Sequence, residues 1–331
     1  MKRNFLFLLI LSLFILGCGK ASLTSSSKTK TIDVFVGIEG LTSEFVKGAP
    51  PPKILQDSEF PVVLRVKNNG AFHVKNAYLN MIRERDYVPK LSVEGNKHKS
   101  SIEENIASFD IDGKTELNIK GDEIVIPFKG KTGKLEPQSE QRLSTLTATL
   151  CYPYKTTLST TTCIDPDVPG IRPGKKVCNV KDLIFNSQGA PIAITKIETV
   201  IVPEENSIMP QFLIFVENKG IGVPVRPEKY KDACLQSETK DERMWNVAFL
   251  KATMPGTEIQ LECNPNEDDK ADKSIGFLRF RDKKSYVRCT YKGKDISRNS
   301  DAYTAPLKVE IDYGYVHTTT TNFLIQKPLK Y

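Results

Sequence analysis

Apolar and polar residues alternate in short segments along most of the chain beyond residue 32. Alternation of this kind places one side of a segment against a core and the other side in water, which is typical of a half-buried β-strand. Gly, Pro and Asn-Gly breaks follow these segments closely, and no window of about 12 residues carries a helical stripe. The pattern therefore predicts an all-β fold of antiparallel strands. Clear examples are residues 34–38, 64–66, 117–119, 124–126 and 309–311.

Two stretches of the chain repeat in the same order. Residues 146–164 align without gaps on residues 307–325, so that a Tyr-Pro-Tyr in the first stretch falls on a Tyr-Gly-Tyr in the second. Upstream, apolar runs end in Asn-x-Gly at 68–70 and again at 218–220. The offset is 150 residues between the glycines and 161 between the tyrosines. Two matches in register predict two copies of one unit.

The length of each copy sets the domain organisation. A unit of about 130 residues is sufficient for a domain with its own core. We therefore expect a first domain at 32–164 and a second at 190–331, with 165–189 as a connector rich in Pro-Gly turns. Each copy would close with a hairpin, in which the Tyr-containing triplet turns the chain into a Thr-rich strand. The prediction is two tandem immunoglobulin-like antiparallel β-sandwiches.

The N-terminus has the features of an export signal. Lys2 and Arg3 precede an apolar stretch, residues 5–16. That stretch is shorter than the roughly 20 residues of a transmembrane helix but suits a secretory signal peptide, here residues 1–17. A polar run then ends at residue 31, and a flexible tether of this kind spans roughly 20 Å.

The end of the signal peptide, Ile-Leu-Gly-Cys at 15–18, resembles the lipobox of prokaryotic lipoproteins. In that family the cysteine becomes the new N-terminus and carries a diacylglyceryl group on its sulfur. The resemblance implies lipidation at Cys18, and two or more acyl chains hold a protein stably on a membrane. The alternative is an ordinary signal peptide with an unrelated cysteine near its end.

The remaining six cysteines predict three disulfides, since an even number in an exported chain indicates a disulfide framework. Sequence alone permits 15 connectivities. We expect Cys151–Cys163 within the first domain, Cys178–Cys234 between connector and second domain, and Cys263–Cys289 across a hairpin. A zinc site is the alternative, but no pair has Cys-x-x-Cys spacing.

Charge and motifs narrow the function classes. Without Lys2 and Arg3 the chain has 45 basic and 40 acidic residues, a net charge of 45 − 40 = +5, and no cluster that would predict a nucleic-acid partner. It contains no Gly-x-Ser-x-Gly, no His-Glu-x-x-His and no phosphate-binding loop. His73, His98 and His317 have no obvious nucleophile nearby in the sequence. We therefore expect no enzyme, no catalytic or metal-binding residues and no cofactor.

Several residues are candidates for binding, each with a structural alternative. The tyrosines could form an exposed aromatic patch for carbohydrate or a partner, although their recurrence in both copies favours a shared packing role. Trp245 is a core residue or a ligand platform. The acidic stretch 264–272 is a solvated hairpin loop or a calcium site, and the basic residues within 279–284 guard a strand edge or bind an acidic polymer. The candidate tyrosines are Tyr152, Tyr154, Tyr313 and Tyr315.

A strand ending in Val-x-Asn-x-Gly, as at 66–70 and 216–220, together with a Tyr- and Thr-rich closing hairpin, resembles CARDB-like and related immunoglobulin-like domains of bacterial and archaeal cell-surface proteins. The resemblance implies a structural, adhesive or protein- or glycan-binding module. Its expected partners are the membrane, through the lipid anchor, and an envelope protein or polysaccharide at the cell surface. The alternatives are an accessory subunit of an envelope assembly or secretion apparatus, and a hydrolase on a β scaffold.

Overall fold

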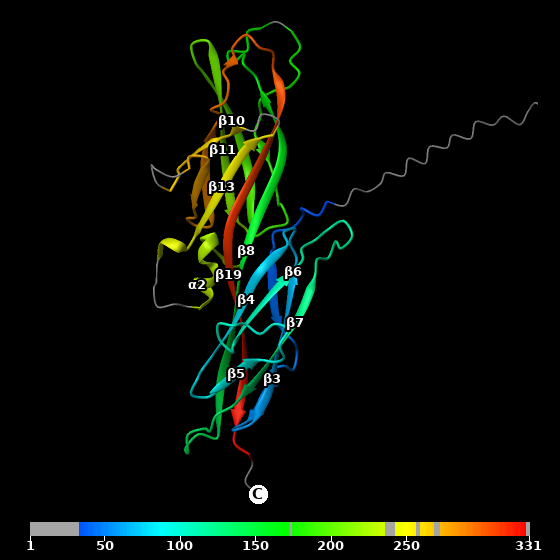
Figure 1. The fold of residues 1–331 in the computed structure, drawn as a ribbon, viewed down its shortest axis with the longest axis vertical. Coiled ribbons are helices and arrows are strands. Elements are labelled where there is room, and N and C mark those ends of the chain that lie inside the picture. Colours follow the sequence, from blue (N-terminus) through cyan, green and yellow to red (C-terminus); the bar gives the residue numbers. More distant parts are fainter. Residues whose placement is uncertain (1–32, 173, 236–241, 256–258, 268–271, 329–331) are drawn as a thin grey trace, which may run out of the picture. The chain divides into compact units, whose positions relative to one another are not determined.

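The computed structural model describes residues 33–172, 174–235, 242–255, 259–267 and 272–328. Strands make up 54% of the chain and helices 4%, in predominantly antiparallel sheets, which confirms the predicted all-β sandwich fold (Figure 1). Residues 33–331 form one compact unit. In the described residues, no helix has the length and apolar character that crossing a membrane requires.

The first half of the molecule is built from seven strands. In a four-stranded sheet, β1, β3, β7 and β5 are neighbours in that order, while β4 and β6 belong to a nine-stranded sheet. The strands are β1 (Leu41–Phe45), β2 (Lys53–Leu55), β3 (Glu59–Asn68), β4 (Val74–Arg83), β5 (Lys90–Val93), β6 (Ile106–Ile111) and β7 (Glu123–Lys131).

The second half comprises the strands from β9 to β18 and three short helices. Its six-stranded sheet has the order β15-β17-β11-β10-β9, with β18 beside β11. The strands are β9 (Leu183–Ile184), β10 (Ile192–Pro203), β11 (Ser207–Asn218), β12 (Val223–Val225), β13 (Val247–Met254), β14 (Ile259–Gln260), β15 (Glu262–Asn264), β16 (Ile275–Arg279), β17 (Lys284–Thr290) and β18 (Ile296–Ser297). The helices are η2 (Pro227–Lys229), α2 (Tyr230–Leu235) and η3 (Glu242–Met244).

Two long strands run through both halves. β8 (Gln141–Ile164) and β19 (Tyr303–Gln326) each have 24 residues and pair antiparallel along their whole length (Figure 1). The hairpin predicted at each tyrosine triplet is therefore wrong, because the chain continues as one strand through Pro153 and Gly314. Proline tolerates an extended backbone and biases the preceding residue toward it, so Tyr-Pro-Tyr does not require a turn.

The strand orders support the predicted repeat. The order β1-β3-β7 in the four-stranded sheet matches β10-β11-β17 in the six-stranded sheet. In the nine-stranded sheet, β6-β4-β8 mirrors β16-β13-β19, because β4 pairs with β6 and β8, just as β13 pairs with β16 and β19. The two copies are thus related by a local twofold near the Pro153–Gly314 pair.

The long strands also exchange their ends between the halves. The last residues of β19 pair with β2 and with the start of β8, in the first half. The end of β8, Leu158 to Ile164, pairs with the start of β19, which in turn pairs with β13 of the second half. The limits 32–164 and 190–331 stay a prediction about the repeat, and strand pairing crosses them.

Candidate functional site

Four tyrosines lie at the centre of the molecule, where β8 and β19 cross from one half to the other. Tyr152 is opposite Tyr315 and Tyr154 is opposite Tyr313. Ring centroids within this group are 5.7–6.2 Å apart. All four side chains are at most 2% exposed. The candidate aromatic binding surface is therefore wrong, and the packing role that we favoured for these residues is confirmed.

Each tyrosine hydroxyl is held by the backbone of one half. Tyr154 Oη accepts from Phe72 N at 3.3 Å, and Tyr315 Oη accepts from Gly222 N at 2.9 Å. Tyr152 Oη accepts from Leu41 N at 3.1 Å, and Tyr313 Oη from Ile192 N at 3.4 Å. The hydroxyls of Tyr152 and Tyr154 thus bind the first half and those of Tyr313 and Tyr315 bind the second. Because the rings of β8 pack on those of β19, the tyrosine cluster connects the two copies.

The repeated Asn-x-Gly turns meet this cluster. Asn68 Nδ2 donates to Phe72 O at 2.8 Å, and Asn218 Nδ2 donates to Gly222 O at 2.9 Å. Each asparagine also accepts from the glycine two residues later, at 3.1 and 3.2 Å. Each buried asparagine therefore fixes the backbone residue, Phe72 or Gly222, whose N–H donates to a tyrosine hydroxyl. Burial is the main cause that raises the pKa of all four phenols, so they stay neutral and serve as hydrogen-bonding groups.

His317 is the histidine that the fold brings close to a hydroxyl nucleophile. Its Nε2 lies 3.4 Å from Ser43 Oγ, and Thr319 Oγ1 is 3.2 Å from the same oxygen. In a Ser–His hydrolase, a third group orients the imidazole. Here Nδ1 of His317 is buried without a hydrogen-bond partner among the described residues. Burial also lowers the pKa of His317 to about 4, which makes it a weak general base.

The six cysteines beyond Cys18 all form disulfides, as predicted, but two of the three expected pairings are wrong. The pairs are Cys151–Cys234, Cys163–Cys178 and Cys263–Cys289, of which only the last was expected. Cys151 and Cys163 lie on the single strand β8, where 12 residues span roughly 40 Å. A disulfide requires Cα atoms within about 7 Å, so these two cannot pair.

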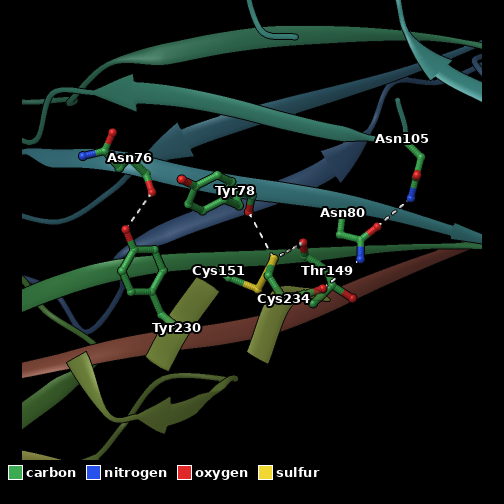
Figure 2. Close-up of a disulfide and its surroundings, with 8 residues drawn as sticks. All are labelled: Asn76, Tyr78, Asn80, Asn105, Thr149, Cys151, Tyr230 and Cys234. Atoms are coloured by element: carbon green, nitrogen blue, oxygen red, sulfur yellow. Dashed lines mark hydrogen bonds between the residues drawn. A yellow bond between two sulfur atoms is a disulfide. The ribbon is translucent and has the colours of Figure 1, made fainter. Parts of the chain in front are cut away.

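Cys151–Cys234 fastens helix α2 against the middle of β8 (Figure 2). The neighbouring contacts hold the same helix: Asn80 Nδ2 donates to Cys234 O at 2.8 Å and Tyr230 Oη donates to Asn76 O at 3.1 Å. Because Asn76 and Asn80 lie on β4 of the first half, α2 of the second half reaches across the centre. The disulfide therefore joins the two copies.

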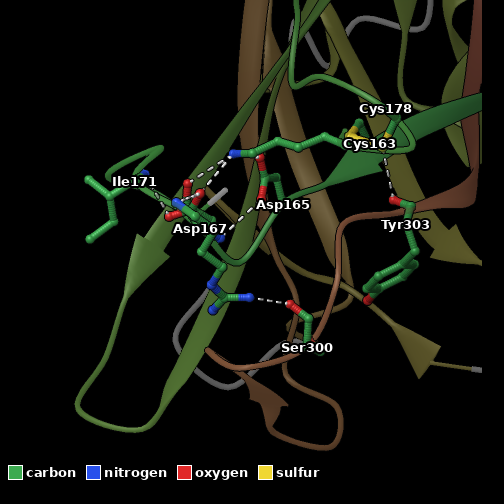
Figure 3. Close-up of polar contacts among 9 residues, drawn as sticks. Cys163, Asp165, Asp167, Ile171, Cys178, Ser300 and Tyr303 are labelled. Atoms are coloured by element: carbon green, nitrogen blue, oxygen red, sulfur yellow. Dashed lines mark hydrogen bonds and ion pairs between the residues drawn. A yellow bond between two sulfur atoms is a disulfide. The ribbon is translucent and has the colours of Figure 1, made fainter. Parts of the chain in front are cut away.

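Cys163–Cys178 anchors the connector beside a small ionic clip (Figure 3). Lys176 Nζ lies 2.7 Å from Asp165 Oδ2 and 3.1 Å from Asp167 Oδ2. Asp167 also accepts from the backbone of Ile171 and Arg172. A lysine thus occupies the space between the two carboxylates, so the arrangement holds the chain. The sequence gives no local signal for this contact, because a Pro-Gly turn separates the acidic residues from Lys176.

The other candidates from the sequence have structural roles or lie outside the described residues. Trp245 is half-buried beside a small apolar cluster that includes Cys151 and Cys234. Among the described residues no group of three or more His, Cys, Asp or Glu could hold a metal ion. The acidic stretch 264–272 is described only in part, and Cys18 with its lipobox lies outside the described residues.

The basic strip sits at the turn between β16 and β17. Arg279 donates to the carbonyl oxygens of Trp245 and Arg243, both at 3.4 Å, and Lys283 Nζ donates to Gly220 O at 3.4 Å. Asp282 and Lys283 have φ of 49° and 65°, which suits a tight turn. Arg279 and Lys283 therefore hydrogen-bond to backbone carbonyls around the hairpin of β16 and β17.

One outward face of the six-stranded sheet gathers aromatic and charged side chains. Phe215 on β11 and Tyr286 on β17 are opposite each other, with ring centroids 6.0 Å apart. Lys196 Nζ on β10 lies 4.7 Å from the Phe215 centroid. Tyr286 is 60% exposed. This face has no signal in the sequence, because Phe215 belongs to the uninterrupted apolar run 212–216, in which alternation is not visible.

No protein-family model and no curated protein matches the chain. Among solved structures it is similar to the secreted serine protease VesC from Vibrio cholerae, with 10% identity, TM-score 0.21, and coverage of 83% of this chain and 50% of that one. The C-terminal domain of the Streptococcus pyogenes antigen I/II-family protein AspA matches at 7% identity and TM-score 0.20, covering 88% and 100%. The B domain of a biofilm-associated protein matches at 10% and 0.14, covering 78% and 72%. The chain thus spans half of the protease chain, and at these TM-scores none of the likenesses supports an argument about function.

Proposed function

We propose that this protein is a lipid-anchored module of the cell surface that works by mechanical support and recognition, without catalysis. The observation that carries the proposal is the 24-residue pairing of β8 with β19. The two strands stay paired without a shift in register from one half to the other, so bending between the halves would distort paired strands. Such a molecule suits a stiff spacer or display element better than a pair of freely hinged domains.

The disulfides support a location outside the cytoplasm. Three disulfides in one chain persist in oxidising compartments and are rare where thiols are kept reduced. The predicted signal peptide and Cys18 provide the export route and the membrane attachment. These sequence features and the cross-links together support the proposed location at the cell surface.

The hydrolase alternative has one geometric element in its favour, the contact between Ser43 and His317. Its imidazole has no orienting partner among the described residues, and its lowered pKa weakens it as a base. A catalytic role would also require donors for a developing oxyanion beside Ser43. The proposal therefore assigns Ser43 and His317 to packing between β1 and β19.

The test of the proposed function is intact mass spectrometry on protein isolated from membranes of its own host. We expect a chain that begins at Cys18 and carries added lipid, and a Cys18→Ala variant that leaves the membrane fraction. A Ser22→Ala variant, altered in the polar tether, is the matched control and should remain membrane-bound with its lipid. An unmodified, freely secreted wild-type chain would overturn the proposal.

A second function, recognition of an envelope polysaccharide, is favoured by the aromatic face of the six-stranded sheet. Flat rings beside charged side chains offer stacking and hydrogen bonding to sugar rings. We expect Tyr286→Ser and Phe215→Ser to weaken binding to the host's purified envelope polysaccharide at least tenfold in a pull-down titration. Leu143→Ser removes an apolar side chain of similar exposure, 59% against 60%, from another face and should bind as wild type. Equal binding by all variants would exclude this face.

A further inference from the structure

An unusual concentration of exposed apolar side chains lies where the described chain begins. Phe35, Val36 and Ile38 are 49%, 54% and 42% exposed, and Leu117 and Ile119 are 101% and 51% exposed. Single exposed apolar residues are common and need no explanation. Five exposed apolar residues in two adjoining segments, in contrast, are typical of an interaction surface. We call these five residues the N-terminal apolar patch.

A hydrogen bond joins the two segments of the patch. Lys114 Nζ, at the start of the 114–121 loop, donates to Val36 O at 3.1 Å. In Figure 1 the blue beginning of the described chain lies beside the loop between β6 and β7, which projects away from the sheets. The patch is therefore one surface feature built from segments about 80 residues apart in the sequence.

The loop that carries Leu117 is held by its own hydrogen bonds. Thr115 N donates to Asn118 O at 3.0 Å, and Asn118 N donates to Thr115 Oγ1 at 2.9 Å. Gly121 N donates to Asn118 O at 3.2 Å, and Asn118 Nδ2 donates to Asp122 Oδ1 at 2.8 Å. Because the turn is fixed from within, Leu117 is presented outward at its tip. The exposure of Leu117 is therefore a feature of an ordered turn with internal hydrogen bonds.

The position of the anchor identifies what covers the patch. Fourteen residues, 19–32, separate Cys18 from Asp33. A chain of that length cannot span more than about 50 Å. If Cys18 is lipidated, the bilayer is within reach of the patch in every molecule. A surface held this close binds weakly attractive groups far more readily than a surface in free solution.

We infer that the N-terminal apolar patch inserts into the interface of the bilayer that carries the anchor. The inference rests on the proposed lipidation of Cys18. Aliphatic and aromatic side chains are favourable at this depth, and a second contact converts a swinging tether into a fixed orientation. Within residues 33–38 and 114–121, Lys114 and Lys120 are balanced by Asp33 and Glu116, and the acidic Glu39, Asp112 and Asp122 border these segments. Insertion should therefore not require anionic lipid.

Depth-dependent fluorescence quenching tests the inference. The full lipidated chain carrying Trp245→Phe and Leu117→Trp is reconstituted in phosphatidylcholine vesicles with and without brominated acyl chains. We expect brominated lipid to quench the tryptophan at 117 at least twofold. The matched control is Ile171→Trp in the same background, because Ile171 is 80% exposed in the connector beyond the end of β8 and should not be quenched (Figure 3). Equal quenching at both positions, or none at 117, would overturn the inference.

A measurement without a new tryptophan guards against the affinity of that residue for interfaces. In hydrogen exchange, residues 33–38 and 113–121 of the vesicle-bound wild-type chain should be protected several-fold relative to the same protein in detergent-free solution after enzymatic removal of the acyl chains. The Leu117→Asp/Ile119→Asp variant should lose this protection, whereas a Leu143→Asp variant should keep it. Unchanged protection in the double variant would contradict insertion.

Failure of the anchor and failure of the insertion give different results. A full-length chain without lipid would refute the proposed function, and the same quenching experiment with saturating vesicles would then show whether the patch binds lipid unaided. No quenching at 117 in that experiment would refute the insertion as well. A lipidated chain that floats with vesicles but shows an unquenched tryptophan at 117 would refute the insertion alone.

Discussion

The two halves of this molecule share a strand order but are held together by different means. The first half, β1 to β7, contains no disulfide of its own and packs aromatic rings, as where Phe60 meets Phe323 at 5.3 Å. The second half contains Cys263–Cys289, and Cys163–Cys178 closes its edge beside the connector. Aromatic rings pack in both halves, as where Phe249 meets Phe277 at 5.9 Å in the second, so the halves differ in their cross-links.

The halves also differ in the hydrogen bonding of one pair of equivalent residues. The repeat places Thr156 of β8 on His317 of β19. Thr156 Oγ1 donates to Ile192 O at 2.7 Å and lies 3.0 Å from Tyr313 Oη. His317 has Ser43 beside one nitrogen, while the other is buried without a partner among the described residues. The hydroxyl of Thr156 thus has hydrogen-bond partners in the second half, whereas one ring nitrogen of His317 has none among the described residues of the first half.

Removing cross-links one at a time is the strongest way to break the comparison. Chain-entropy estimates give about 4.5 kcal/mol for Cys151–Cys234, about 3.5 for Cys263–Cys289 and about 3 for Cys163–Cys178, because the closed loops span 83, 26 and 15 residues. Urea unfolding of paired Cys→Ala variants measures the order. Hydrogen exchange on the Cys263→Ala/Cys289→Ala protein should show the second half opening first. Opening of the first half before the second would contradict a greater dependence of the second half on its disulfides.

Acid should act on the first half through His317. An unfolded histidine takes up its proton below about pH 6.5, whereas burial lowers the pKa of folded His317 to about 4. Its contribution to stability is therefore complete above pH 6.5 and is lost as the pH falls toward 4, by at most about 3 kcal/mol. His317→Thr, which copies Thr156, should reduce the difference in urea stability between pH 7 and pH 4. A variant with the wild-type pH dependence would show that other groups dominate.

The two Asn-x-Gly turns offer a finer comparison. A methyl group added at Gly70 would collide with Tyr154 Oη and with the carbonyls of Gly189 and Glu39, whereas at Gly220 it would meet Tyr315 Oη and Pro191. We expect each Gly→Ala change to destabilise by about 2 kcal/mol, with Gly70→Ala the worse because backbone cannot move aside.

The matching phenylalanine substitution makes room at each turn. Thermal unfolding of Gly70→Ala/Tyr154→Phe and Gly220→Ala/Tyr315→Phe should show greater rescue at Gly220. Greater rescue at Gly70 would mean that its backbone neighbours yield.

The smallest expected effect is also the sharpest test of the twofold. Tyr154→Phe and Tyr315→Phe each remove one hydroxyl from an equivalent buried position, at a cost of about 1 kcal/mol. Urea midpoints for the two variants should agree within error. Tyr286→Phe, on an exposed ring, serves as the control and should leave the midpoint unchanged. A large difference between the two buried sites would show that the halves depend unequally on the cluster.

The even number of cysteines in an exported chain predicted that the six beyond Cys18 are oxidised. Residues 34–38 and 117–119 were expected as strands from their alternation, but they form loops. Alternation correctly predicted the all-β class and the strands at 64–66, 124–126 and 309–311, and repetition predicted the matching strand orders of the two halves. These features are local, or depend only on comparing one stretch with another. The matching Asn-x-Gly turns and tyrosine triplets in particular identified residues that the fold brings into contact. Their role in packing was the favoured interpretation because a binding surface has no reason to recur at equivalent sites.

The cysteine pairing and the hairpin could not be predicted because both depend on where a strand ends. Pro153 looks like a turn residue, yet a proline can lie in an extended strand when its partner Gly314 tolerates the missing donor. Once β8 is read as continuous, Cys151 and Cys163 are far apart, and each must find a partner elsewhere. The contact of Ser43 with His317 has no local signal at all, since 274 residues separate the two.

The exchange of strand ends has a consequence for the order in which the polypeptide can fold outside the cytoplasm. β2 and the beginning of β8 in the first half receive their neighbour from the last part of β19, so residues 53–55 wait for residues 324–326. Contacts of such long sequence separation form slowly, because the intervening loop must close first. During translocation the first half would remain an unfinished sheet with an open side until almost the whole chain had emerged. Completion of the first half therefore depends on the emergence of the C-terminal strand, and until then β2 and the start of β8 have free edges.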